Sequence, residues 1–206
     1  MAETTRRREK QRAYNEAHGI TPASVRKHID LDTIVLNEGI TNYTVIHNHI
    51  HATRPLRLFT SGASSLGWNG GAAIGMKLAA PDKTVVSLTG DGSYMFSQPS
   101  TVHWIARRYQ TPFLHVVYNN RGWRAPKFSA LAVHPEGFAS KAGDLGVAFD
   151  PPPDYSGIAA AGGGAFARVV KRPEDLDSAI EAALHAVRQE GRAAVLDVWL
   201  AHLMQR

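Results

Sequence analysis

The chain has 206 residues, 44 % of them hydrophobic and 20 % charged, which excludes a disordered or collagen-like chain and fits one globular domain with a short appendage. It has no cysteine, which excludes a disulfide scaffold, a thiolate metal site and a cysteine nucleophile and fits a reducing cytosol. No apolar run is long enough to cross a membrane, and no apolar stretch follows the first arginines as it would in a secretory signal. We therefore expect a soluble, cytoplasmic protein with no membrane partner.

The net charge of +5 first invites the idea of nucleic-acid binding, but the charge is unevenly distributed. Residues 1–30 contain seven Lys or Arg and four Asp or Glu, whereas the other 176 residues contain 16 and 14. This asymmetry predicts two units: a basic helical appendage or linker over residues 1–30 and a nearly neutral domain over residues 31–206.

Within the appendage, the pattern predicts a polar helix over Thr5–Ala17 that Gly19 ends, and a second helix that begins at Thr21-Pro22. The stretch RRREKQRAYNEAHGITPASVRKHI resembles a segment near the carboxyl end of the B component of the DNA-repair excinuclease ABC. None of the ATP-binding or helicase motifs of that protein is present, so the resemblance implies no repair function. We expect a solvated linker helix and no nucleic-acid partner, with a DNA-associated accessory role as the alternative.

After the appendage, short apolar β-branched runs alternate with helical patterns. The predicted strands are Thr33–Leu36, Leu56–Phe59, Thr84–Leu88, Phe113–Tyr118, Phe166–Val170 and Ala194–Leu200. The predicted helices are Thr41–His51, Trp68–Ala79, Gln98–Arg108, Tyr155–Ala161 and Glu174–Glu190. This alternation predicts an α/β fold, a three-layer sandwich with an about six-stranded, mostly parallel sheet and helices on both faces. A ligand of such a sheet binds at the carboxyl ends of its strands.

The stretch from Gly122 to Asp154 is rich in Pro, Gly and Lys and predicts one long irregular segment. Loops longer than about 15 residues in a compact domain are usually functional or disordered, so a lid over the ligand site is one hypothesis. Three cations near its start, Arg121, Arg124 and Lys127, either bind the carboxylate of a substrate or are solvated loop charges.

Polar clusters directly follow two consecutive predicted strands. Gly90-Asp91-Gly92-Ser93 follows the first and Asn119-Asn120 the second, with 26 residues between GDG and NN. That spacing suits a loop, a helix and a returning strand, so both clusters reach the same edge of the sheet. Carboxylate and amide oxygens suit Mg²⁺ or Ca²⁺, and the glycines and the helix that begins at Ser93 suit a phosphate. The pattern predicts a metal diphosphate site, although Asp91 alone also fits a simple Asx turn.

GDGS followed by NN at this distance resembles the cofactor signature of thiamine diphosphate enzymes. The surrounding sequence, FTSGASSLGWNGGAAIGMKLAAPDKTVVSLTGDGSYMF, is similar to the diphosphate-binding domain of acetolactate synthase, benzoylformate decarboxylase and pyruvate decarboxylase, and the likeness covers about residues 31–203. The resemblance implies thiamine diphosphate and Mg²⁺ as cofactors of a lyase or transferase that acts on a small 2-oxo acid. By this resemblance, the cofactor would supply the electron sink for cleavage next to the carbonyl of the 2-oxo acid.

The same resemblance implies a set of cofactor-binding residues: Gly39, Ile40, Ser64, Leu66, Gly90, Asp91, Gly92, Ser93, Asn120 and Gly122. The metal ligands would be the side chains of Asp91 and Asn120 and the backbone carbonyl of Gly122. Leu66 matches the bulky residue that holds the cofactor in its bent form, and the backbone of Ser64 would accept a hydrogen bond from the aminopyrimidine.

Members of this family carry a catalytic glutamate on a separate pyrimidine-binding domain of the partner subunit. This sequence has no second α/β domain, so we assign no catalytic residue and expect an incomplete enzyme. It would act with a pyrimidine-binding domain or subunit in a homo- or hetero-oligomer, or it is the carboxyl-terminal part of a longer protein. Glu38 lies on the wrong domain to be that glutamate and is interpreted as a strand-end carboxylate. The alternative is a catalytically inactive cofactor-binding or regulatory domain.

The segment HNHIH contains His47, His49 and His51, and the first and last of these would share one face of a helix, as zinc ligands do. Ile46 and Ile50 give the same helix a core face, and no third ligand is evident nearby. We interpret the segment as a surface helix or one next to the cofactor, with a zinc site as the alternative.

Overall fold

The computed structural model describes residues 32–50, 52–61, 65–142 and 146–203, together with Ala13 and Ala17, which are helical. The strands are β1 (Thr33–Glu38), β2 (Leu58–Thr60), β3 (Thr84–Gly90), β4 (Leu114–Asn119), β5 (Phe166–Val170) and β6 (Ala194–Trp199). The helices are η1 (Ile40–Asn42), α2 (Tyr43–His49), α3 (Trp68–Ala79), α4 (Asp91–Phe96), α5 (Pro99–Arg108), α6 (Arg124–Val133), α7 (Phe138–Lys141), α8 (Tyr155–Gly163), η2 (Pro173–Asp175) and α9 (Leu176–Arg188). None of the described helices is long and apolar enough to span a membrane. The rest of the helices predicted within residues 1–30 lies outside the described residues.

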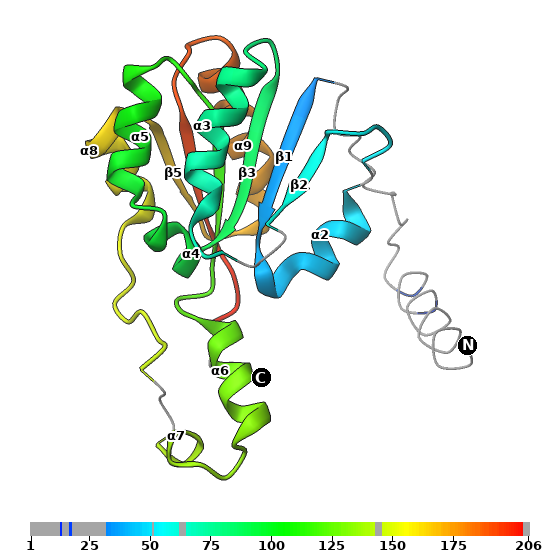
Figure 1. The fold of residues 1–206 in the computed structure, drawn as a ribbon, viewed down its shortest axis with the longest axis vertical. Coiled ribbons are helices and arrows are strands. Elements are labelled where there is room, and N and C mark those ends of the chain that lie inside the picture. Colours follow the sequence, from blue (N-terminus) through cyan, green and yellow to red (C-terminus); the bar gives the residue numbers. More distant parts are fainter. Residues whose placement is uncertain are drawn as a thin grey trace.

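The strands form one parallel six-stranded sheet in the order β2-β1-β3-β4-β6-β5. Figure 1 shows α3 and α5 on one side of the sheet and α9 on the other. β1 is buried along its whole length, as expected of a parallel strand that is covered on both faces. The predicted three-layer α/β sandwich is confirmed.

Side chains on neighbouring positions of β1 enter different cores. Leu36 packs in a cluster with Ala73 of α3, whereas Val35 packs in a cluster with Ile46 of α2. Val86 and Val116 contact both the α2 cluster and the cluster formed by the buried alanines of α9. Helices α2 and α9 therefore cover one face, and α3 covers the other.

Helix α3 and strand β5 have the predicted bounds. Several other predicted bounds need correction. The helix predicted over Thr41–His51 is instead the 3-10 turn η1 followed by the shorter α2, and the helix predicted over Glu174–Glu190 begins as η2 and ends as α9 at Arg188. The helix placed after GDG begins earlier than predicted, because α4 begins at Asp91 and precedes α5.

The prediction of one irregular segment over Gly122–Asp154 is wrong in part, since α6 and α7 lie within it. No residue of α6 is buried, and its apolar Phe128 and Val133 are exposed. Pro126 lies in the first turn of α6, where a missing N–H breaks no helical hydrogen bond. Figure 1 shows α6 and α7 projecting away from the sheet.

Candidate functional site

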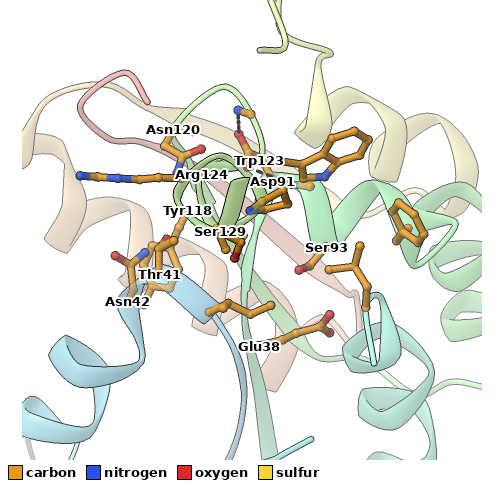
Figure 2. Close-up of a pocket in the computed structure, with 18 residues that line it drawn as sticks. Glu38, Thr41, Asn42, Asp91, Ser93, Tyr118, Asn120, Trp123, Arg124 and Ser129 are labelled. Carbon is orange, nitrogen blue, oxygen red and sulfur yellow. Dashed lines mark hydrogen bonds between the residues drawn. The ribbon is translucent and has the colours of Figure 1, made fainter. Parts of the chain in front are cut away.

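The segments that follow β1, β3 and β4 line a cavity of about 450 Å³, shown in Figure 2. The lining comes from the end of β1 and the turn after it, the turn before α3, the β3–α4 junction and the segment from β4 into α6. Its residues are Glu38, Ile40, Thr41, Asn42, Leu66, Gly90, Asp91, Gly92, Ser93, Phe96, Tyr118, Asn120, Gly122, Trp123, Arg124, Ala125, Pro126 and Ser129. The cavity therefore lies at the edge of the sheet where the sequence predicts a ligand.

Asp91 is the first residue of α4 and is 2 % exposed. Its two carboxylate oxygens accept hydrogen bonds from the backbone N–H of Gly92 at 2.8 Å and of Gly122 at 2.9 Å. Burial raises the pKa of Asp91 to about 6, and these backbone donors oppose the shift without cancelling it. No described Lys or Arg forms an ion pair with Asp91. A bound cation would compensate this buried carboxylate.

The two adjacent asparagines after β4 have different environments. The Asn119 amide donates to the Asp197 carboxylate at 2.8 Å, and its oxygen accepts from the Arg121 N–H at 3.1 Å. Asn120 lines the cavity, is 8 % exposed, and its Oδ1 is a buried oxygen without a hydrogen-bond partner. Asn120 thus offers a free oxygen at the cavity that Asp91 also lines, and Asn119 ties β4 to β6.

Gly122 connects this corner to the rest of the site. Its φ of +150° and the crowding by the Val147 carbonyl and Leu203 restrict the position to glycine. Its N–H is committed to Asp91, and its carbonyl accepts from the Arg124 N–H at 3.2 Å, which leaves one lone pair of that oxygen unused. The structure therefore places Asp91, Asn120 and Gly122 around one cavity, and their role as metal ligands stays a prediction.

Gly92 allows a close approach between α4 and the segment after β4. A Cβ at this position would collide with the Trp123 indole, whereas a Cβ at Gly90 would meet no atom within 4 Å. Ser93 is 5 % exposed and lines the cavity next to Asp91. Backbone and hydroxyl donors at the start of a helix, beside glycines, suit an anionic group.

The remaining predicted residues lie on the β1 and α3 sides of the site. Ile40 and Leu66 line the cavity. Gly39 does not line it but lies between the lining residues Glu38 and Ile40; its N–H donates to Asn37 Oδ1 at 3.0 Å, and a Cβ would press on Ile46 and Tyr118. Ser64 lies outside the described residues.

Glu38 is the main residue that sequence reasoning missed. It ends β1, as interpreted, but it also lines the cavity and is 2 % exposed. Its carboxylate accepts hydrogen bonds from the N–H groups of Gly67 at 2.5 Å and Asn69 at 3.0 Å. The signal was available, because β1 ends at the same edge of the sheet as β3 and β4.

The first turns of α6 form the other wall, within the segment for which a lid over the ligand site was one hypothesis. Of the three cations near the predicted lid, Arg124 lines the cavity, whereas Arg121 lies over the Trp199 ring at 5.1 Å and Lys127 is not in the lining. The Arg124 guanidinium lies 5.1 Å from the Phe128 ring centroid and pairs with no acid of the described residues.

The described histidines of HNHIH do not form a metal site. His47 and His49 are exposed on α2, and His51 lies outside the described residues. In the part of the chain that the structure describes, no three His, Cys, Asp or Glu side chains lie close enough together to hold a metal ion.

A parallel sheet whose carboxyl edge presents a buried carboxylate, an unpartnered amide oxygen and a glycine-lined helix start defines an α/β domain for a phosphorylated ligand. The family described as "Thiamine pyrophosphate enzyme, C-terminal TPP binding domain" matches residues 39–198, and the chain belongs to this family. The predicted class of domain and its cofactor, thiamine diphosphate, are thereby confirmed.

The curated relatives are enzymes of this class. The sulfoacetaldehyde acetyltransferase of Castellaniella defragrans is 25 % identical over 193 residues, which make up 91 % of this chain and 31 % of that protein. The acetolactate synthase isozyme 3 large subunit of Escherichia coli is 30 % identical over 154 residues, or 70 % of this chain and 24 % of the relative. The chain spans about a third or less of the length of these relatives.

Solved structures share the fold. The thiamine diphosphate-dependent 4-hydroxybenzoylformate decarboxylase of Rhodococcus jostii superposes with a TM-score of 0.70 at 24 % identity, over 87 % of this chain and 31 % of that one. The benzoylformate decarboxylase of Polynucleobacter necessarius gives a TM-score of 0.68 at 21 % identity, over 87 % of this chain and 32 % of that one.

Residues 1–30 match a different family, Ultra-violet resistance protein B. The UvrABC system protein B of Oleidesulfovibrio alaskensis is 70 % identical over 30 residues, which are 15 % of this chain and 4 % of that protein. The resemblance of the appendage to this excinuclease component is confirmed over this short segment.

Proposed function

We propose that the chain binds thiamine diphosphate through Mg²⁺ and is the diphosphate-binding half of a 2-oxo-acid decarboxylase or acetolactate synthase-like enzyme. The observation that carries the proposal is the convergence of Asp91 and Asn120, from two different strand ends, on one cavity. A buried carboxylate without a cation and a buried amide oxygen without a donor are the ligand types that Mg²⁺ prefers.

The proposed residue roles follow from this donor set. The side chains of Asp91 and Asn120 and the free lone pair of the Gly122 carbonyl would hold Mg²⁺. Gly90, Gly92 and Ser93 would contact the diphosphate, Gly39 and Ile40 would approach the cofactor from the β1 side, and Leu66 and Ser64 would meet its thiamine end. When bound, the cofactor supplies the electron sink for cleavage next to a carbonyl.

A second chain or domain is part of the proposal. Phe96 lines the cavity and yet is 57 % exposed, so one wall of the cavity is open to a covering surface. We propose that a pyrimidine-binding domain covers this wall in a homo- or hetero-oligomer and supplies the catalytic glutamate. Mixing the chain with such a domain should produce turnover of a 2-oxo acid, whereas a cofactor-binding regulatory domain would stay inactive in every combination.

The cofactor site is tested by Asp91→Ala in the full chain, with calorimetric titration of thiamine diphosphate at several Mg²⁺ concentrations. We expect the affinity to fall at least about 100-fold and its Mg²⁺ dependence to disappear, because a charged metal ligand is lost. Asp197→Asn is the matched control, since Asp197 is equally buried at a strand but does not line the cavity. Unchanged affinity and Mg²⁺ dependence in Asp91→Ala would contradict the proposal.

We further propose that residues 1–30 form a separate basic appendage to the domain over residues 31–206. Its match to a segment of a DNA-repair protein keeps one alternative function open, an accessory role on DNA. Fluorescence anisotropy with duplex DNA at low salt distinguishes the two. A linker gives no binding, whereas an accessory protein gives binding that weakens steeply with salt and is lost when Arg6, Arg7 and Arg8 become Glu.

A further inference from the structure

Glu38 occupies a place in the cavity that the proposed cofactor roles leave unexplained. Figure 2 shows its side chain at the end of the cavity away from Asn120, with Ser93 nearer to it than Asp91. The residue is 2 % exposed, although a buried carboxylate without a function is costly.

The carboxylate of Glu38 caps helix α3 across 29 residues of sequence. The N-cap residue of α3 is Gly67, which has no side chain that could accept the first amides of the helix. Both oxygens of Glu38 do so instead, from Gly67 at 2.5 Å and from Asn69 at 3.0 Å. Asn69 in turn donates to the Thr89 hydroxyl at 2.6 Å, so β1, α3 and β3 are joined at one point.

This contact fixes the turn that carries Leu66 into the cavity. Leu66 directly precedes Gly67 and lines the cavity. On one side the turn is packed against α4, because the left-handed Gly67 lies so close that a Cβ would be 2.6 Å from the Phe96 carbonyl carbon. On the other side, among the described residues, Glu38 is the side chain that holds the Gly67 amide.

The electrostatic environment of Glu38 is a balance of opposing effects. Burial raises its pKa, whereas the N–H groups of Gly67 and Asn69 and the Ser93 hydroxyl favour the ionised form. The amino end of the 12-residue helix α3 acts in the same direction as these donors. The carboxylate and the turn therefore stabilise each other, and shortening or neutralising the side chain leaves at least one of these two amides without its acceptor.

We propose that Glu38 is a positioning residue that holds the Leu66–Gly67 turn against β1 and so sets the affinity of the cavity for the thiamine end of the cofactor, separately from its diphosphate. The inference rests on the proposed function. It predicts that Asp91 contributes to the affinity for every diphosphate, whereas Glu38 contributes only to the affinity for ligands that carry the thiamine rings.

The test compares two probes, thiamine diphosphate and inorganic pyrophosphate, each titrated calorimetrically with Mg²⁺ into the full chain. Glu38→Gln retains the shape of the side chain but turns an amide donor toward backbone donors. We expect its affinity for thiamine diphosphate to fall at least about tenfold while its affinity for pyrophosphate stays within about twofold of wild type. A merely structural role would lower both affinities together.

Each outcome has a consequence. Equal losses for both probes, or no loss for either, overturn the positioning role. Asp197→Asn, the matched buried carboxylate, should change neither affinity. If Glu38→Gln does not fold, Glu38→Asp replaces it, since the shorter acid keeps the charge but not the reach; wild-type affinity for thiamine diphosphate in that variant overturns the proposal. Failure of the proposed function looks different, because wild type would then bind neither probe.

Discussion

Two regions of this domain bury polar side chains, and they differ in what lies next to those side chains. At the carboxyl edge of the sheet, Glu38, Asp91 and Asn120 face a cavity of about 450 Å³. On the face covered by α5 and α8, His103 and His115 are fully buried among aromatic rings, with 5.8 Å between their ring centroids. All four ring nitrogens of these histidines lack a hydrogen-bond partner.

Burial shifts the pKa values of the two regions in opposite directions. It raises the pKa of Asp91 to about 6 and lowers the pKa of His103 to about 4, because in each case the charged form loses its hydration. It also lowers the pKa of His115, beside His103. A cation can enter the cavity and compensate Asp91, but the lining of that cavity does not include the histidines. Unsatisfied groups at the edge therefore point to a ligand, whereas those in the core are a cost to stability.

The largest effect on stability is expected around the buried histidines, where α8 packs on α5 without any gap. Gly163 of α8 packs on α5 so tightly that a Cβ would collide with the His103 carbonyl. We expect Gly163→Ala to lower the free energy of unfolding by about 3 kcal/mol, because the obstacle is backbone that cannot move aside. Urea denaturation measures this, and Gly75→Ala, in α3 with no atom within 4 Å of its Cβ, should be neutral or slightly stabilising. Equal effects of the two substitutions would contradict the close packing of α5 on α8.

At the cavity on the carboxyl edge of the sheet, a glycine substitution should weaken cofactor binding and leave the fold intact. A Cβ at Gly92 displaces the half-buried Trp123 indole from the cavity wall. We expect Gly92→Ala to weaken thiamine diphosphate binding about 100-fold, equivalent to about 2.7 kcal/mol, with a change in unfolding free energy below about 1 kcal/mol. Calorimetry and urea denaturation separate the two quantities. Gly71→Ala, on the exposed side of α3, is the control, and a loss of stability without a loss of binding would reverse our comparison.

The two regions were also unequally predictable from sequence. The sheet was predictable because most of its strands are short apolar runs, such as Ile34–Leu36 of β1, that alternate with helical patterns. The helix α6 was not, because Gly122, Pro126 and Lys127 give its segment the composition of a loop. None of its residues is buried, so α6 contributes to the cavity wall without joining the core.

The candidate site was predictable where spacing along the chain encodes position in the sheet. Asp91 and Asn120 follow consecutive strands, so parallel topology alone brings them to one edge. The place of Glu38 at the end of β1 was predicted, and its position at the cavity could have been inferred from the shared edge of the sheet. Its hydrogen bonds with the amides of Gly67 and Asn69 could not, because these amides come from a segment about 30 residues away. Contacts of that kind leave no local pattern in the sequence.

Acidification should lower the free energy of unfolding through the buried histidines. The folded pKa of His103 is about 4 and its ordinary value is 6.5, so below pH 6.5 the unfolded chain takes up the proton first and stability is lost as the pH falls. Between pH 7 and pH 5 this loss is about 2 kcal/mol for His103 alone. His103→Leu should remove it, so the unfolding free energy of the variant falls by about 2 kcal/mol less over that range. The exposed His47→Gln is the control, and parallel pH profiles for wild type and His103→Leu would contradict the assignment.

The smallest expected effect is the pH dependence of stability that comes from Asp91 in the cavity, and its sign is opposite to that of His103. In the metal-free chain, the pKa of Asp91 is raised from its ordinary value of 3.8 to about 6, so its stabilising contribution is fully present below pH 3.8 and is lost as the pH rises through 6. Acidification from pH 7 to pH 5 should therefore recover about 1 kcal/mol through Asp91.

Asp91→Asn cannot make this recovery, so in the presence of EDTA its unfolding free energy should fall by about 1 kcal/mol more than that of wild type over the same range, as urea titrations at the two pH values would show. Saturating Mg²⁺ and thiamine diphosphate should abolish the difference in slope, because a bound cation keeps the wild-type carboxylate ionised. A slope that the cofactor leaves unchanged would mean that Asp91 does not face the metal. The pH dependence of stability thus reports whether the Asp91 carboxylate binds a cation in the cavity.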